Sequence, residues 1–212
     1  MSRLGFAGAA RRDGAEHVSF TFDDGPDEVW TPRVNAELAR LGVRATFFAI
    51  GERVLRWPEL VRRAVAVGHE VQLHCHRHIR HTQLTEPELR SDTERGLEAL
   101  ASVGVEPTLW RAPWGITTPA SRRLARAFGL RLIGWSIDTH DWRGDEPATM
   151  LAAARPALPV GGSILMHDAL GPGATRSGCE NTVALLEGLT EAARRLGMEP
   201  TPLRCAEAQV SR

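Results

Sequence analysis

Apolar residues along this chain fall into two alternating patterns, short runs and longer amphipathic stretches. The short runs are rich in β-branched and aromatic residues and predict strands at 17–22, 44–50, 70–73, 108–110, 130–137, 163–166 and 199–203. The longer stretches repeat apolar positions at helical spacing and predict helices at 31–41, 52–67, 86–103, 118–128, 146–157 and 180–196. Such alternation predicts an α/β fold with a parallel sheet, either a closed barrel or a doubly wound sheet.

Length, charge and cysteine content narrow the class of protein. The 212 residues suit one domain spanning 1–212, in which we expect residues 1–15 to be poorly ordered. The 26 basic and 26 acidic residues balance, so the charge gives no reason to expect a nucleic-acid partner. No apolar run approaches the ~18–20 residues of a membrane span, and the N-terminus lacks the apolar segment of a secretion signal. Three irregularly spaced cysteines favour a reduced, cytoplasmic protein, while the oligomeric state stays unknown.

Reactive side chains gather where the predicted strands end. The first strand runs directly into Asp23 and Asp24, followed by a Gly-Pro turn. Later strands are followed by further reactive residues, which are His74, His78, Arg111, Asp138, Asp141, His167 and Asp168. In parallel β/α folds the carboxyl ends of the strands share one rim, and that rim carries the active site. The sequence therefore predicts a single site built from five strand ends.

The Asp pair and two histidines predict a metal site. Two adjacent carboxylates repel each other unless a cation lies nearby. His74 and His78 are four residues apart, so a helical turn would place both imidazoles on one side. One carboxylate with two imidazoles leaves an open coordination position, as a catalytic zinc requires. We expect one divalent ion, with Zn²⁺ first and Co²⁺ or another ion as alternatives.

The other rim residues can supply acid and base. The Asp that does not bind metal can act as a general base, and Arg111 can orient it. His167 can protonate a leaving group, and Asp138 can hydrogen-bond one of its ring nitrogens. This combination predicts hydrolysis of an amide or ester. Each motif alone is weak evidence, since D-D-G-P is usually a surface turn and H-x-x-x-H predicts metal poorly.

Four tryptophans and one aspartate lie near these strand ends. Trp114 and Trp142 lie in rim loops and can stack on a sugar. Trp110 and Trp135 lie inside predicted strands, so we expect them in the core. Asp168 is expected to fix its loop rather than to react.

Five short motifs follow one another along the chain: T-F-D-D-G-P (21–26), H-C-H-R-H (74–78), R-A-P-W-G (111–115), D-T-H-D-W (138–142) and L-M-H-D (165–168). Together they resemble the motif series of the polysaccharide deacetylases of carbohydrate esterase family four. The compact length, the missing secretion signal and segment 171–182 look more like the nodulation-type chitooligosaccharide deacetylases than the secreted wall enzymes. The resemblance implies a distorted (β/α)7 barrel and a metal-dependent, usually zinc-dependent, removal of acetyl groups from N-acetylglucosamine units.

Matching positions imply a role for each residue of the motifs. Asp23 would be the catalytic base, oriented by Arg111. Asp24, His74 and His78 would bind the metal.

The same resemblance assigns the acid and the substrate pocket. Asp138 would tune His167, the catalytic acid, and the backbone N–H of Trp114 would help to hold the oxyanion. Leu165 and Trp142 would line the pocket for the acetyl methyl. The residues expected to contact substrate are Pro113, Trp114, Trp142 and Leu165.

Two positions depart from the family pattern. Cys75 stands where the family usually has a small hydroxyl residue, and Trp114 stands where it usually has Tyr. Neither change removes a ligand or a catalytic group, so an active enzyme is expected. Three alternatives stay open: the same chemistry on an acetylated amino-sugar intermediate of small-molecule biosynthesis, a non-catalytic carbohydrate-binding protein, and a cyclic-amide hydrolase. The sequence leaves the length and linkage of the substrate open.

Overall fold

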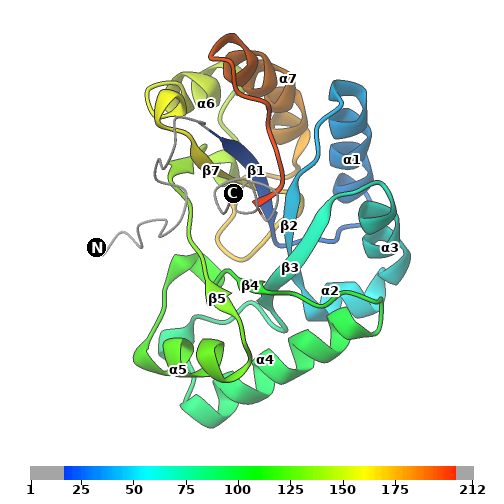
Figure 1. Ribbon diagram of the computed structural model, residues 1–212, viewed down its shortest axis with the longest axis vertical. Helices are drawn as coiled ribbons and strands as arrows, with labels where there is room; N and C mark the ends of the chain where they lie inside the picture. The colour runs from blue at the N-terminus through cyan, green and yellow to red at the C-terminus, as the bar shows by residue number, and fades with distance from the viewer. Residues whose placement is uncertain (1–16, 204–212) are drawn as a thin grey trace, which may run out of the picture.

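In the part of the chain that the structure describes, a curled sheet of seven parallel strands forms the centre, and seven helices cover its outer face (Figure 1). The computed structural model describes residues 17–203, so the prediction for residues 1–15 lies outside the described range. The strands are β1 (Val18–Asp23), β2 (Thr46–Ile50), β3 (Glu70–Cys75), β4 (Leu109–Trp110), β5 (Arg131–Leu132), β6 (Ile137–Asp138) and β7 (Gly162–His167), in the order β5-β4-β3-β2-β1-β7-β6. The helices are α1 (Trp30–Leu41), α2 (Gly51–Arg56), α3 (Pro58–Ala66), α4 (Glu86–Ala101), α5 (Pro119–Ala127), α6 (Pro147–Ala154) and α7 (Glu180–Arg195). This architecture confirms the distorted (β/α)7 barrel.

The central strand β1 has different chemistry on its two faces. Alternate side chains of a strand point to opposite faces. Phe20 and Phe22 pack with the helices in the main core, and the Phe22 ring stacks on Phe47 of β2 at 5.0 Å between centroids. The residues that alternate with them, Thr21 and Asp23, are polar and also buried. The inner face of the barrel is therefore polar towards the end where β1 reaches Asp23.

A small apolar cluster lies in the interior beside Arg111, whose guanidinium carbon is 4.1 Å from the centroid of the Phe48 ring. It consists of Phe48, Leu109 and Leu203, with Ile133 against it. The N–H of Leu203 donates to Thr46 Oγ1 (3.0 Å), at the first residue of β2. The predicted strand at 199–203 is wrong, because this segment crosses the starts of β1 and β2 instead of joining the sheet.

The predicted strand at 130–137 is also wrong, because the structure divides it between the two edges of the sheet. β5 pairs with β4 at one edge, and β6 pairs with β7 at the other. Gly134 lies in the crossing between them, and its carbonyl accepts a hydrogen bond from Arg111 (2.9 Å). The sheet is thus open between β5 and β6, and a buried side chain holds the chain that crosses the opening.

The predicted helix at 52–67 is divided in a similar way. Trp57 has non-helical dihedral angles (φ −131°, ψ 57°), and Pro58 begins α3. The residue before a proline disfavours the helical conformation, so the break is local in origin.

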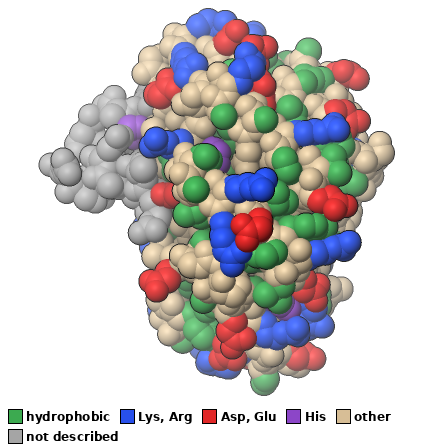
Figure 2. All heavy atoms as spheres, turned by 90° about the vertical axis from the view of Figure 1, so that its right-hand side faces the viewer, with side chains coloured by type: hydrophobic (Ala, Val, Ile, Leu, Met, Phe, Trp, Pro, Cys, Tyr) green, Lys and Arg blue, Asp and Glu red, His purple; other side chains and the backbone are tan. Residues whose placement is uncertain are grey.

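Charged side chains of both signs are interspersed on the face that carries α1 and α3 (Figure 2). Some form exposed ion pairs, such as Arg40 with Glu37 and Arg62 with Glu59. This mixture matches the balanced composition. Within residues 17–203, no helix is both long enough and apolar enough to cross a membrane.

Candidate metal centre and active site

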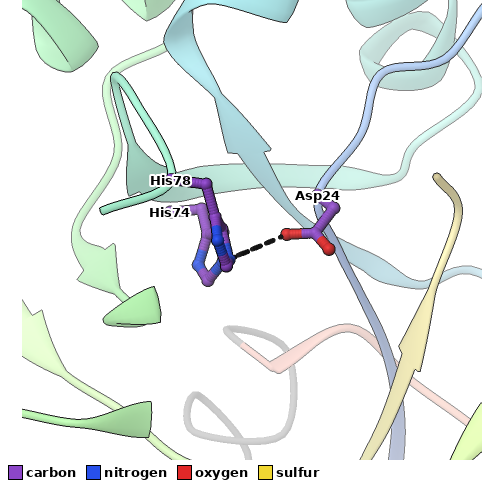
Figure 3. Close-up of side chains that lie close together, drawn as sticks. All are labelled: Asp24, His74 and His78. Carbon is purple, nitrogen blue, oxygen red and sulfur yellow. Dashed lines mark ion pairs between the residues drawn. The ribbon is translucent and has the colours of Figure 1, made fainter. Parts of the chain in front are cut away.

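Asp24, His74 and His78 meet at the carboxyl ends of β1 and β3 (Figure 3). Asp24 follows the last residue of β1 and adopts a left-handed conformation (φ 77°). Its Oδ1 lies 3.4 Å from His74 Nε2 and 3.2 Å from His78 Nε2. Each residue offers one ligand atom, and these atoms lie within 4.8 Å of one another. The three side chains predicted as metal ligands are thus brought together.

The protonation and burial of these groups fit a divalent cation. His74 Nδ1 lies 2.7 Å from the carbonyl oxygen of Arg111. A carbonyl only accepts, so Nδ1 carries the proton and Nε2 keeps a lone pair facing Asp24. Asp24 Oδ1 is buried without a hydrogen-bond partner among the described residues. Two imidazole nitrogens and one carboxylate are a donor set that zinc and similar ions accept.

Asp92 of α4 supports the chain between the two histidines. His74 lies within β3 and residues 76–77 form a bend, so this bend, and not a helical turn, brings the two imidazoles together. Asp92 Oδ2 accepts the N–H of His76 (2.9 Å) and Oδ1 accepts the N–H of Arg77 (3.0 Å). The carboxylate is only 5 % exposed. Sequence reasoning missed Asp92, although a charged residue on the apolar face of a helix was a usable signal.

The Asp23 carboxylate is held by Arg111. The guanidinium donates from Nη1 to Asp23 Oδ1 (2.8 Å) and to Thr21 Oγ1 (2.8 Å). Arg111 is 0 % exposed, and its guanidinium carbon lies 4.1 Å from the centroid of the Phe48 ring. The structure therefore fixes one oxygen of Asp23 and compensates its charge, as the sequence predicted for this pair.

His167 pairs with Asp141, so the predicted Asp138–His167 contact is wrong. His167 Nδ1 lies 2.7 Å from Asp141 Oδ1, and the His167 N–H donates to Asp141 Oδ2 (2.9 Å). Asp138 instead accepts the N–H of His140 (2.8 Å). His140 adopts a left-handed conformation (φ 56°), and the turn that it makes brings Asp141 to His167.

The charges around His167 favour its protonated form. Burial lowers the pKa of His167, but the adjacent Asp141 carboxylate, with smaller effects from Asp24 and Asp23, raises the pKa to about 9. The pKa of Asp141 is lowered. Burial would raise it, but the positive charges of His167 and Arg176 have the larger effect. At neutral pH the imidazolium can therefore donate a proton.

Arg176 is a second residue that sequence reasoning missed. Its Nη1 donates to Asp141 Oδ2 (2.9 Å), and its Nη2 donates to the carbonyl of His167 (3.1 Å). It lies in segment 171–182, for which the sequence analysis noted a resemblance to nodulation-type deacetylases but no role for any residue. Arg176 thus links this loop to the acid pair.

A cavity of about 340 Å³ opens over these groups. Its walls include most of the predicted site residues and three tryptophans, and the lining includes Asp23, Asp24, His74, His78, Trp114, Trp135, Asp138, Trp142, Leu165 and His167. Trp135 was expected in the core and instead lines the cavity half-buried, whereas Trp110 is buried as expected. Pro113 is buried and is not among the lining residues.

Asp168 does not line this cavity and is fixed in place at a second, smaller one. Its Oδ2 accepts the hydroxyl of Thr31 (2.5 Å), which matches the expectation that it holds its loop. Burial raises the pKa of Asp168 to about 7, against the opposing effect of Thr31.

Comparisons with known proteins agree with this geometry. Residues 10–133 match the polysaccharide deacetylase family. The chain belongs to this family. It is 35 % identical over 198 residues to the chitooligosaccharide deacetylase of Bradyrhizobium sp. (strain ANU 289), with 90 % of each chain covered. The resemblance read from the five motifs is thereby confirmed.

Solved structures place this polysaccharide deacetylase among the family 4 carbohydrate esterases. The structure of a family 4 carbohydrate esterase from Streptomyces lividans in complex with acetate matches with a TM-score of 0.78 and 30 % identity, covering 87 % of this chain and 91 % of that one. A family 4 pseudoenzyme from Bacillus anthracis shares the fold, with a TM-score of 0.82 and 20 % identity, covering 92 % and 66 % of the two chains. Because the fold also occurs in a pseudoenzyme, the fold alone does not show catalysis, which depends on the side chains of the site.

Proposed function

We propose that this polysaccharide deacetylase is a metal-dependent hydrolase that removes the acetyl group from N-acetylglucosamine-containing oligosaccharides. The observation that carries the proposal is the presence, around one cavity, of a metal-ligand set, a carboxylate held by Arg111 and an imidazole paired with a buried carboxylate. Binding a sugar requires no acid–base pair, so this arrangement favours an enzyme over a binding protein. The name of the Bradyrhizobium relative supports a chitooligosaccharide-like substrate.

Asp24, His74 and His78 would hold the ion, with Zn²⁺ as the first candidate. When bound, the ion would supply positive charge that polarises the acetyl carbonyl and acidifies water. The fixed Nδ1–H of His74 keeps its Nε2 available as a ligand.

Asp23 is the proposed base. Arg111 holds Asp23 Oδ1, so the carboxylate faces the cavity in one orientation. It would take one proton from the attacking water as the oxygen bonds to the acetyl carbon. The developing negative charge on the acetyl oxygen would be held in part by the backbone N–H of Trp114, which lies in a tight left-handed turn (φ 54°, ψ 13°).

His167 is the proposed acid. Asp141 holds its Nδ1, which leaves the Nε2–H to protonate the amine nitrogen as the C–N bond breaks. Acetate and a free amine would result, which balances the addition of one water. Trp142 and Leu165 would contact the acetyl methyl.

The cytoplasmic location expected from the sequence stays a prediction.

The size of the cavity is also compatible with a smaller substrate. At about 340 Å³ it lies near the lower end of ligand pockets, and it suits a short acetylated amino sugar as well as one unit of a longer chain. This observation favours, as the second candidate, the same chemistry on an acetylated amino-sugar intermediate.

Acetate release from N-acetylglucosamine oligomers of one to six units tests the proposal. We expect release that stops on chelation, returns with added Zn²⁺ and increases with oligomer length. Asp23→Asn should bind one equivalent of metal and lose turnover, whereas His74→Ala should lose both. Release from the single sugar alone would favour the second candidate. Metal binding without release from any oligomer would contradict the proposed hydrolase.

A further inference from the structure

Arg80 places a cation in the cavity beside the proposed metal ligands. It follows His78 by two residues, and both side chains line the cavity. The Arg80 guanidinium carbon lies 4.3 Å from the centroid of the Trp114 ring, and that ring lies 4.2 Å from the ring of His78. The aromatic face holds the guanidinium by a cation–π contact. The Trp114 ring thus contacts both the Arg80 guanidinium and the imidazole of His78, a proposed metal ligand.

The other charged groups that line the cavity have ion-pair neighbours, whereas Arg80 has no anionic neighbour among the described residues. Arg176 pairs with Asp141 (2.9 Å), and the lining carboxylate Asp138 contacts His140 Nδ1 (3.2 Å). Arg80 is half-buried, and within residues 17–203 no carboxylate lies at ion-pair distance from it. A partly desolvated charge without a partner is unfavourable, and a substrate anion would relieve it.

We propose that Arg80, held by Trp114, forms a subsite for a carboxylate on the sugar next to the N-acetylated unit. The inference rests on the proposed deacetylation and narrows its substrate class to acidic oligosaccharides. A guanidinium binds a carboxylate through two parallel N–H donors, which gives both affinity and orientation. A neutral oligosaccharide offers Arg80 only hydroxyl groups, which it binds more weakly than a charged acceptor.

Two matched substrates test the subsite. One is a tetrasaccharide in which N-acetylglucosamine alternates with glucuronic acid, and the other is the same tetrasaccharide with each carboxyl group reduced to an alcohol. We expect the wild-type protein to deacetylate the acidic form with a kcat/KM about 10–100-fold higher, as one charge-assisted contact implies. Arg80→Gln should remove this preference, mainly by raising KM for the acidic form. Arg80→Lys should keep part of the preference, because it retains charge without the planar fork.

Two results would overturn the subsite. One is an equal loss on both substrates in Arg80→Gln, which would indicate a structural role. The other is a wild-type protein that turns over both forms equally. Calorimetric binding of both tetrasaccharides to zinc-loaded Asp23→Asn protein, with and without Arg80→Gln, repeats the comparison without turnover. If neither form is deacetylated but the acidic one binds more tightly only with Arg80 present, the hydrolase proposal fails and the subsite stands.

Discussion

The Asp92 carboxylate offers a quantitative test of how the metal loop is held. The buried N–H of His76 and the N–H of the exposed residue Arg77 donate to it at 2.9 and 3.0 Å. Leaving one buried donor unsatisfied costs about 1–3 kcal/mol. Asp92→Ala leaves the buried N–H of His76 without an acceptor and should therefore lower the free energy of unfolding by about 1–3 kcal/mol. Asp92→Asn keeps one carbonyl oxygen as an acceptor and should lose about half as much.

The same contacts should determine metal affinity. The bend that Asp92 holds lies between His74 and His78, so a mobile bend would no longer keep both imidazoles in place. Groups that support metal ligands typically contribute about 10–100-fold to affinity. We expect the Zn²⁺ dissociation constant to increase in the order wild type, Asp92→Asn, Asp92→Ala.

Competition calorimetry with a chelator measures the affinity, and urea unfolding of the metal-free protein measures the stability. Glu94→Ala is the matched control, because Glu94 is exposed on the same helix and pairs only at 3.6 Å with Arg90. It should change stability by less than about 1 kcal/mol. Unchanged zinc affinity in Asp92→Ala, measured where the variant is still folded, would refute the reasoning and assign the loop geometry to the His74–Arg111 contact.

Three further predictions follow from the site. The pKa of His167 is raised to about 9, so the acid is protonated below that value and kcat/KM should fall as pH rises through it. Asp141→Asn should move this fall in kcat/KM to lower pH, while Asp138→Asn should leave it in place. A pH–rate profile of each variant measures the shift, and circular dichroism at each pH checks that the variant stays folded. Arg111→Met should destabilise the protein by about 3–5 kcal/mol in urea unfolding, because it leaves Asp23 buried without its cation; a smaller loss than Glu94→Ala would contradict this. Saturating Zn²⁺ at about 100 times its dissociation constant should stabilise the protein by about 2.7 kcal/mol, and His74→Ala should remove this effect in thermal unfolding.

The parallel sheet was predictable because its strands are buried and separated by amphipathic helices. The opening in the sheet was not, since residues 130–137 read locally as one strand. Their division is imposed by distant partners: Ile133 donates to the carbonyl of Trp110, and Ser136 donates to the carbonyl of Ser163. Such contacts join residues that are more than 20 positions apart, and no local pattern encodes them.

The residues of the candidate site were predictable to the extent that they lie in short motifs. The choice between Asp138 and Asp141 was not, because both occupy one motif and a single left-handed residue, His140, decides which of them reaches His167. Asp92 and Arg176 lie outside the motifs. Their roles depend on how α4 and the 171–182 loop pack, and this packing exists only in the folded chain.

The proposed acid, His167, and the proposed base, Asp23 with Arg111, differ in how much a substitution would disturb the rest of the structure. Asp141 keeps a second cation, Arg176, so a change at His167 would leave that buried carboxylate compensated. Arg111 instead joins Asp23 to the chain that crosses the open edge of the sheet, so changes there disturb the barrel together with the chemistry. A descendant of this protein that abandoned hydrolysis but kept its sugar cavity should therefore first show substitutions at His167, with Arg111 retained.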